Sequence, residues 1–307
     1  MEIGINATGL VAGASIPKII AHARAAAEDG FSSYWLAEHP TGGFDLLTVL
    51  SAVGVAVPGV RLGTAVIPTW PRHPVALAGQ AVTVNEMLEG RLTLGVGLSH
   101  KPFMQQLGIE FDKPIRHLRE FLSVLGPLLA EGRVDSSGQS ISAQAQFFQA
   151  PRFSLPIMVA ALGPQALKVA GSLTDGTVLA WVGPKTIREH IAPTIQAAAE
   201  AAGRAAPKIV ATLPVCVTSQ ESVIRDKVAH NLSMYGKLPS YRAMLDREGV
   251  DGPADVAIVG EEQAVVDQIM ALQQAGVTEF TASEFVTNPD EQAATREILK
   301  TLRAQAN

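Results

Sequence analysis

The fold is decided by residues 61–97, which read RLGTAVIPTWPRHPVALAGQAVTVNEMLEGRLTLGVG. Two short apolar runs in it, Arg61–Val66 and Arg91–Gly97, read as strands. The segment between them, Val75–Leu88, is about twice as long and its apolar spacing predicts a helix. Strands that are apolar on both faces are typical of a parallel sheet covered by helices. The stretch therefore predicts one strand–helix–strand unit of a parallel α/β fold.

The same alternation continues through the rest of the chain. Six further strands are predicted, at Glu2–Asn6, Ser33–Ala37, Pro156–Ala160, Thr177–Trp181, Lys208–Val217 and Thr278–Ala282. Further helices are predicted at Ile16–Asp29, Leu46–Val57, Ile115–Leu129, Gln165–Ser172, Lys185–Ala202, Glu261–Ala275 and Pro289–Ala304. Eight strands favour a (β/α)8 TIM barrel, whose active site lies on the carboxyl ends of the strands.

An open, doubly wound sheet also alternates strands and helices. That fold binds nucleotides through a glycine-rich loop after its first strand. Here the first turn reads NATGLVAGAS, in which Gly9 and Gly13 are too far apart for GxGxxG, and GxxxxGK[ST] does not occur in the sequence. The closed barrel is therefore favoured over the open sheet.

We expect residues 1–307 to form one barrel domain with two insertions. The Ser- and Gln-rich stretch near 132–152 interrupts the alternation, and its second half indicates a hairpin or an excursion from the barrel. The polar stretch near 221–255, which contains several aromatic residues, is longer than an ordinary connection. We expect it to form a lid or an excursion from the barrel.

Composition narrows the classes of partner. The 307 residues carry 24 Lys and Arg against 29 Asp and Glu, a net charge of −5, and no basic run stands out, which argues against nucleic-acid binding. No apolar stretch approaches the ~20 residues of a membrane span. A single cysteine, Cys216, and an N-terminus without the order of a secretory signal indicate the cytoplasm. A small-molecule substrate is the expected partner.

Two strand ends carry an imidazole. The second strand ends in Ala37-Glu38-His39-Pro40, where an acid and a histidine lie together at the mouth of the predicted barrel. This pair indicates proton transfer, although hydrogen bonds to the following loop would also explain it. The fourth strand continues into Leu98-Ser99-His100 after Gly95-Val96-Gly97. Its small residues suit either the close approach of a planar ligand or tight packing of the barrel rim.

The fifth and sixth strands end in further candidates. Ala160-Ala161-Leu162-Gly163 comes directly before a predicted helix, where free backbone N–H groups hold phosphates well, and an ordinary turn explains the same residues. Trp181 closes the sixth strand, as the wall of a pocket or as a cap on the core. The seven histidines form no HExxH, HxH or His/Cys cluster, and GxSxG is missing, so we expect neither a metal site nor a serine hydrolase.

Taken together, several motifs resemble the luciferase-like monooxygenase superfamily, especially its branch that depends on the deazaflavin coenzyme F420. The resemblance covers almost the whole chain. Its motifs are WLAEH at 35–39, RLGTAV at 61–66, GRLTLGVG at 90–97, PIMVAALGPQALKVAGSLTDG at 156–176 and GEEQAVVDQIMALQQAGVTEF at 260–280.

The resemblance implies a barrel that is usually dimeric, with an isoalloxazine-like ring over the strand ends. His39 matches the acid/base histidine of that superfamily, and Ala65-Val66 matches the position of a bulge that often contains a non-proline cis peptide. His100 becomes a second candidate proton donor. The residues implied to contact the cofactor are Glu38, Ala65, Val66, Pro68, Leu98, Ser99, Ala160, Ala161, Leu162, Gly163, Leu179 and Trp181.

The departures from the resemblance narrow the activity. The sugar-phosphate dehydrogenases of this branch carry Thr and Lys after the sixth strand, where this chain has Ala180 and Gly183, so we do not expect sugar-phosphate oxidation. The leading hypothesis is an F420-dependent oxidoreductase that transfers a hydride between the deazaflavin and a small organic substrate. The alternatives are an FMN-dependent monooxygenase of the same superfamily and a barrel that binds a flavin-type ligand without catalysis.

Overall fold

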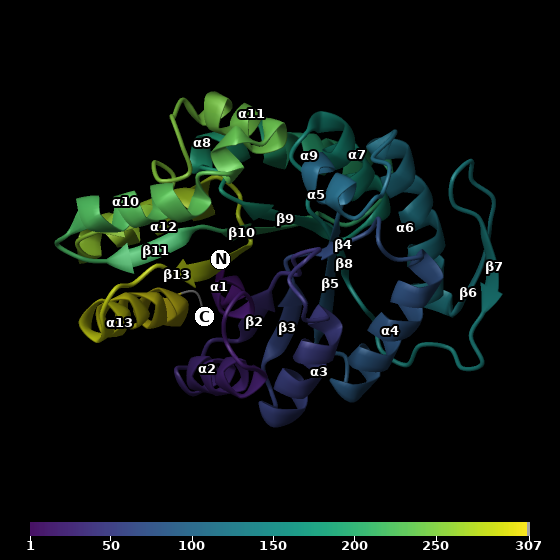
Figure 1. The fold of residues 1–307 in the computed structure, drawn as a ribbon, viewed down its shortest axis with the longest axis horizontal. Coiled ribbons are helices and arrows are strands. Elements are labelled where there is room, and N and C mark those ends of the chain that lie inside the picture. The colour runs from purple at the N-terminus through teal and green to yellow at the C-terminus, as the bar shows by residue number, and fades with distance from the viewer. Residues whose placement is uncertain (306–307) are drawn as a thin grey trace.

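The computed structural model describes residues 1–305, which form a closed barrel of eight parallel strands (Figure 1). The strands follow the order β1 (Glu2–Asn6), β2 (Ser33–Leu36), β3 (Arg61–Thr64), β5 (Leu92–Gly97), β8 (Ile157–Val159), β9 (Gly176–Ala180), β10 (Lys208–Thr212) and β13 (Glu279–Glu284). The barrel closes where β1 pairs with β13, from Glu2 opposite Glu279 to Ile5 opposite Ala282. The predicted (β/α)8 fold is therefore confirmed.

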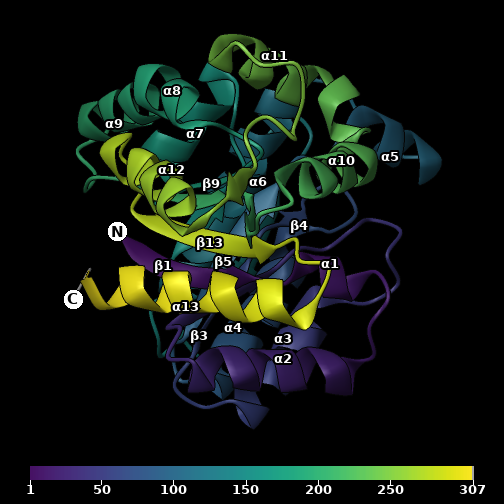
Figure 2. The same cartoon turned by 90° about the vertical axis from the view of Figure 1, so that its left-hand side faces the viewer.

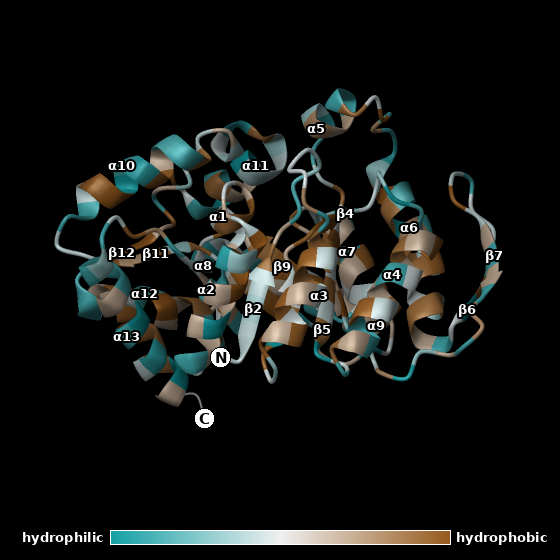
Figure 3. Ribbon diagram, turned by 60° about the horizontal axis from the view of Figure 1, so that its bottom comes forward, coloured by the Kyte–Doolittle hydropathy of each residue, from teal (hydrophilic) through white to brown (hydrophobic). Residues whose placement is uncertain are grey.

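Helices surround the strands, as the two perpendicular views show (Figures 1 and 2). Asp45 illustrates how the sequence begins one of them, because its carboxylate accepts a hydrogen bond from the Thr48 N–H at 2.8 Å. The larger helices are α2 (Ile16–Glu28), α3 (Leu46–Ala56), α4 (Pro74–Met87), α6 (Pro114–Glu131), α7 (Pro164–Leu173), α9 (Ala192–Ala201), α12 (Glu262–Gln274) and α13 (Pro289–Gln305). Apolar residues gather along the strands and the inner helix faces (Figure 3).

A tryptophan fills the barrel interior. The ring of Trp35 packs with Met158, Val178 and Val210, and it lies where a Cβ on Gly63 would be 2.2 Å from the indole. Gly63 is therefore needed for space. The indole N–H donates to the buried carboxylate of Glu279 at 2.9 Å, which satisfies the polar group of an otherwise apolar filling.

Two predicted strands are wrong in detail. The strand predicted at Lys208–Val217 divides at Leu213 into β10 and β11 (Pro214–Val217), because Pro214 has no N–H with which to continue the ladder. β11 pairs with β13 and with β12 (Ile258–Gly260), a strand that the sequence did not predict. The strand predicted at Arg61–Val66 ends at Thr64, and the chain resumes pairing with β5 as β4 (Ile67–Pro68) after a cis peptide.

The Ser- and Gln-rich stretch forms an antiparallel hairpin of β6 (Arg133–Ser136) and β7 (Ala143–Gln146). The carboxylate of Glu120 on α6 ties the tip of this hairpin to the barrel, because it accepts hydrogen bonds from three consecutive backbone N–H groups, those of residues 139–141, at 2.8 to 3.0 Å. These charge-assisted bonds hold the pKa of Glu120 below its usual range against the opposing effect of burial.

A second long segment, residues 221–248, contains α10 (Glu221–Leu232), a 3-10 turn (Tyr235–Lys237) and α11 (Pro239–Glu248). We call it the cover segment. Together with the short helices α1 (Thr8–Val11) and α5 (Lys101–Gln106), it lies at the end of the barrel opposite the N-terminus (Figure 3). Within residues 1–305, no helix has both the length and the apolar character that crossing a membrane requires.

The seam between β13 and the outer helices contains a buried ion cluster. Arg296 donates to Glu284 at 2.8 and 3.0 Å and to Asp29 at 2.8 Å, and His22 lies 3.3 Å from Glu284. Burial alone would raise the pKa of Glu284, but the hydrogen bonds and charges of His22 and Arg296 outweigh it and lower the pKa to about 2. The ionised carboxylate therefore stabilises the folded state.

Replacing Glu284 with Gln should lower the free energy of unfolding by about 3 kcal/mol at pH 7, because Arg296 loses its buried partner. A depressed carboxylate pKa stabilises the fold above the unfolded-state value and loses this effect as the pH falls toward about 2. The difference from wild type should therefore shrink below about pH 4.5. Urea unfolding at pH 7 and pH 3.5 measures it, with exposed Glu297→Gln as control. Equal stability of the Glu284 variant and wild type at pH 7 would contradict this role.

Candidate active site

The carboxyl ends of the strands meet at the barrel mouth, below α5 and the cover segment (Figure 3). Most of the residues that the sequence analysis selected lie on loops that leave these strand ends. Their side chains take three roles: some line the mouth, some hold its loops, and some point away into the core.

Glu38 holds a loop through both of its oxygens. Its carboxylate receives the guanidinium of Arg72 at 2.5 and 3.0 Å and the backbone N–H of Leu46 at 3.1 Å. Arg72 also binds Asp45 at 2.8 Å, and the two carboxylates together raise the pKa of Arg72 despite its partial burial. Glu38 is therefore held between an arginine and the start of α3. The sequence analysis missed Arg72, since nothing in TWPRHP marks it as the partner of an acid far along the chain.

His39 is exposed on the same loop and has one free ring nitrogen. Its Nδ1 accepts a hydrogen bond from the Thr41 N–H at 3.3 Å and lies 3.1 Å from the Thr41 hydroxyl. A backbone donor at Nδ1 assigns the proton of the neutral imidazole to Nε2. The ring packs edge-on to Phe103 of α5 with centroids 4.9 Å apart. His39 can therefore donate a proton or a hydrogen bond from Nε2.

The peptide bond between Ala65 and Val66 is cis, as the resemblance implied. The Ala65 N–H donates to Leu36 at 2.7 Å, and the Val66 carbonyl accepts from the Glu38 N–H at 3.1 Å, so this peptide is bonded to the loop of His39. Both side chains rest on the Trp35 cluster in the barrel interior. The cis peptide thus lies between the filled interior and the mouth.

The glycines of β5 make room for this arrangement. A Cβ on Gly95 would lie 2.0 Å from the Thr64 carbonyl oxygen, and one on Gly97 would lie 2.6 Å from Val66 Cγ2 and 3.2 Å from Ala160. Tight packing, the plainer of the two interpretations of this motif, therefore explains both glycines. Val66, Gly97 and Ala160 meet as a floor of small apolar groups.

Pro68 is buried at the end of β4, and the loop after it is fixed by an aromatic stack. Trp70 lies parallel to His117 with ring centroids 3.7 Å apart, and His117 Nε2 is 3.0 Å from the Thr69 hydroxyl. Burial lowers the pKa of His117 to about 4, so this imidazole is neutral at pH 7 and serves packing.

The end of β5 presents Ser99 and His100 to the mouth, while Leu98 is partly buried against the main core. Ser99 has a φ of 57°, an unusual left-handed backbone for a serine. The ring of His100 lies 5.9 Å from Phe103 and 5.5 Å from Tyr241. Burial lowers the pKa of His100, which is therefore a neutral donor or acceptor at pH 7.

An aromatic rim continues from His100 across the mouth. Tyr241 on α11 packs edge-on to Tyr235 at 5.5 Å, and Tyr235 lies 5.8 Å from Trp181 at the end of β9. Trp181 has a φ of 58°, a second strained backbone at a strand end. The sequence analysis missed both tyrosines. The only sequence feature that pointed to them was the aromatic content of the stretch near 221–255, which is longer than an ordinary connection.

The turn after β8 begins a helix whose first N–H groups have no side-chain cap. Gly163 is the N-cap residue of α7, and His190 Nε2 donates to the Leu162 carbonyl at 2.9 Å, which fixes the turn.

The side chains of two predicted cofactor contacts do not point toward the barrel mouth. Ala161 and Leu179 are buried in the cluster between sheet and helices, because alternate residues of a strand face opposite sides.

A polar chain crosses the opposite side of the mouth. Asn6 at the end of β1 donates to the Thr212 hydroxyl at 3.2 Å, and Thr212 lies 2.5 Å from the Thr281 hydroxyl. All three are buried and hydrogen-bonded. Like the tyrosines, they were not predicted, because single polar residues within apolar strands carry no pattern.

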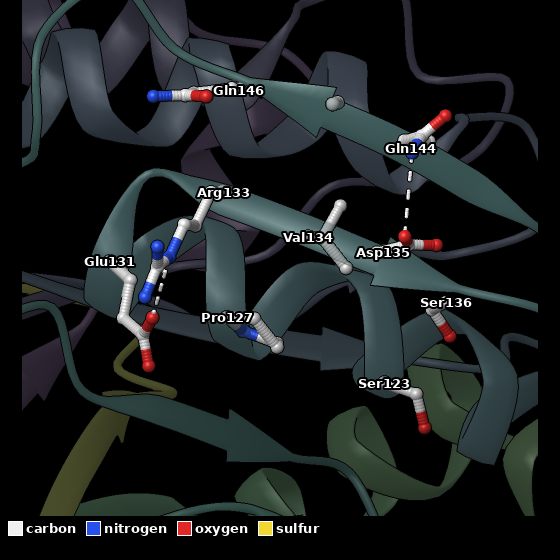
Figure 4. Close-up of a pocket in the computed structure, with 10 residues that line it drawn as sticks. Ser123, Pro127, Glu131, Arg133, Val134, Asp135, Ser136, Gln144 and Gln146 are labelled. Carbon is white, nitrogen blue, oxygen red and sulfur yellow. Dashed lines mark hydrogen bonds and ion pairs between the residues drawn. The ribbon is translucent and has the colours of Figure 1, made fainter.

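A groove of about 650 Å³ lies elsewhere, between α6 and the hairpin (Figure 4). Two pairs of its polar side chains bond to each other, Arg133 with Glu131 at 3.1 Å and Gln144 with Asp135 at 3.4 Å. In the part of the chain that the structure describes, no three His, Cys, Asp or Glu residues gather as a metal site would require.

Known proteins share this architecture. An F420-dependent glucose-6-phosphate dehydrogenase of Microbacterium testaceum is 27% identical over 284 residues, 87% of this chain and 79% of the relative. The solved structure of the coenzyme F420-dependent tetrahydromethanopterin reductase from Methanopyrus kandleri covers 100% of this chain and matches over 99% of its own, with a TM-score of 0.82 and 22% identity.

An FMN complex has the same fold. The oxygenating constituent of 3,6-diketocamphane monooxygenase from Pseudomonas putida has a TM-score of 0.75 at 17% identity, over 99% of this chain and 97% of that one. At such identities the two structures establish the fold alone. The sequence itself matches the family model of luciferase-like monooxygenases over residues 1–279. The chain therefore belongs to the luciferase-like monooxygenase family.

Proposed function

We propose that this protein is an F420-dependent oxidoreductase that transfers a hydride between the deazaflavin and a small organic substrate. The observation that carries the proposal is the hydrogen bond from the Glu38 N–H to the Val66 carbonyl at 3.1 Å, which joins the apolar floor to the loop that presents His39 Nε2. The F420-dependent relative, which is 27% identical over 87% of this chain, supports the choice of cofactor.

The residues at the mouth fit such a cofactor. Val66, Gly97 and Ala160 meet so closely that their surface is small and apolar, which suits one face of a flat ring. The uncapped start of α7 after Gly163 offers backbone N–H groups and the positive end of a helix dipole to a phosphate. We infer that the ring rests on the first set and that the phosphate is held by the turn 160–163.

The bound deazaflavin would supply the hydride chemistry, and the chain's own residues would supply position and protons. His39 Nε2 is assigned to transfer the proton that accompanies the hydride. The Arg72–Glu38 ion pair keeps the His39 loop in place. His100, neutral through burial, would hydrogen-bond the substrate rather than carry charge. The aromatic rim and the cover segment would exclude water from the reacting groups.

The first measurement is a titration of the purified protein with oxidised F420 and, separately, with FMN, followed by quenching of cofactor fluorescence. We expect micromolar binding of F420 and at least tenfold weaker binding of FMN. Tight binding of FMN would favour the monooxygenase alternative. Binding of neither cofactor would contradict a redox function.

His39→Gln should lower kcat at least about 100-fold with a substrate found by screening the cofactor-loaded protein, because the proton donor is lost. Binding of F420, read from the same fluorescence titration, should change little. His230→Gln, at an exposed position on α10, is the matched control. Unchanged kcat in the His39 variant would remove His39 from the reaction.

We also propose that the protein is a cytoplasmic homodimer that buries the face formed by α3 and α4. Two large apolar side chains are exposed there, Val55 at 64% and Met87 at 49%. A groove between α3 and α4 is lined by Met87 and by small residues that include Ala76 and Gly79. Such a face suits close packing of helices from a second copy.

Sedimentation velocity tests the dimer. Val55→Glu should convert a dimer into a monomer, because a charge would then be buried at the contact. Val223→Glu, which introduces the same charge at another exposed valine on α10, should leave the dimer intact. A wild-type protein that sediments as a monomer at 10-fold increasing concentrations would refute the proposal.

A further inference from the structure

A carboxylate from the cover segment occupies the start of a helix at the barrel mouth. Oε1 and Oε2 of Glu248 accept hydrogen bonds from the backbone N–H groups of Lys185 at 3.1 Å and Thr186 at 2.7 Å. These N–H groups belong to the first turn of a continuous helix, residues 184–201, in which α8 (Pro184–Thr186) passes through a π-helical stretch (Ile187–Ile191) into α9.

The contact is electrostatic. The first N–H groups of a helix have no partner within the helix and carry a partial positive charge, so they favour an anion. Among the ion pairs formed by residues 1–305, none joins Glu248 to a lysine or arginine. The backbone amides are therefore the groups that bind this carboxylate. Bonds of this charge-assisted kind are stronger than neutral ones.

Gly183 makes the contact possible. A Cβ at this position would lie 2.3 Å from Glu248 Cδ. The backbone of Gly183 has a φ of −80°, which any residue adopts, so glycine is needed here for space and not for conformation. The absence of a side chain at Gly183 therefore leaves the space that the carboxylate of Glu248 occupies.

A second bond joins the same two elements. The Thr186 hydroxyl donates to the Met244 carbonyl on α11 at 3.1 Å, and both residues are buried. α8 and α11 lie side by side in both views of the ribbon (Figures 1 and 2). Through this attachment α11 carries Tyr241 against His100, and the adjoining turn carries Tyr235 against Trp181.

We propose that Glu248 is a latch that determines specificity. Its carboxylate fixes the cover segment over the mouth, and it also occupies the anion-binding position at the helix start that follows β9. The site therefore accepts substrates that are uncharged at that end. The inference that the site excludes anionic substrates rests on the proposed oxidoreductase function. An anionic substrate group would have to displace Glu248 from Lys185 and Thr186, and would meet its negative charge. The inference that Glu248 fixes the cover segment concerns the fold alone.

Hydrogen exchange of the cofactor-free protein tests the latch itself. In Glu248→Ala, backbone amides of α11 should exchange about tenfold faster than in wild type, because two charge-assisted hydrogen bonds are lost. Gly183→Ala should produce the same local effect with the charge retained, since its Cβ displaces the carboxylate. Asp226→Ala, at an exposed position of α10 on the same cover segment, is the control. Unchanged exchange of α11 in both test variants would overturn the latch.

Inorganic phosphate tests the exclusion of anions. With the protein saturated by oxidised F420, 10 mM phosphate should leave the wild-type Tm unchanged and raise that of Glu248→Ala by about 2 °C, because the freed N–H groups can then bind it. If Glu248→Ala folds poorly, Glu248→Gln takes its place, and phosphate should raise the Tm of that variant as well. Equal responses of wild type and variants would refute the exclusion. Failure of F420 to bind would refute the proposed function and leave the exchange result to decide the latch.

Discussion

The pairing of β1 with β13 closes the sheet, and a buried carboxylate inside the barrel secures that closure. Glu279, the first residue of β13, accepts hydrogen bonds from the Ser33 hydroxyl at 2.5 Å and from the Trp35 indole at 2.9 Å, so it joins β13 to β2 across β1. Trp35 then fills the interior, which Gly63 allows. Because the interior is solid, ligands can enter only at the rim, and the positions of the strand ends decide what the rim can bind.

At that rim, the path of the backbone and the sizes of the neighbouring side chains depend on each other. β3 stops at Thr64, whose hydroxyl takes over bonding to β5, donating to the Gly95 carbonyl and accepting from the Gly95 N–H, both at 2.7 Å. The chain then turns through the cis peptide, and the missing side chains of Gly95 and Gly97 leave room for it. One consequence is a small apolar floor. Another is that the His39 loop is bonded to this floor, through the Glu38 N–H and the Val66 carbonyl.

Sequence reasoning predicted the barrel because each strand and helix is marked locally, by apolar runs, caps and glycine turns. It selected His39 from its place at the end of the second strand, and it predicted the cis peptide through the resemblance of whole motifs. It could not decide the role of Glu38, since Arg72 reaches it only in the folded chain. It also missed β12 and the division of Lys208–Val217, where one proline ends a ladder within an apolar run that looks continuous. Tyr235, Tyr241 and Glu248 were missed for the same reason as Arg72: their significance comes from partners distant in sequence.

We propose that the floor formed by Val66, Gly97 and Ala160, together with the His39 loop bonded to it, forms the binding site of a deazaflavin ring. A crystal structure of the protein with oxidised F420 tests this proposal. We predict a ring in van der Waals contact with Val66 and Ala160, with His39 Nε2 on the open side of the ring, and a phosphate bonded to the N–H groups after Gly163. A ring bound in the groove beside the hairpin, or at the mouth but away from Val66 and Ala160, would contradict this binding site.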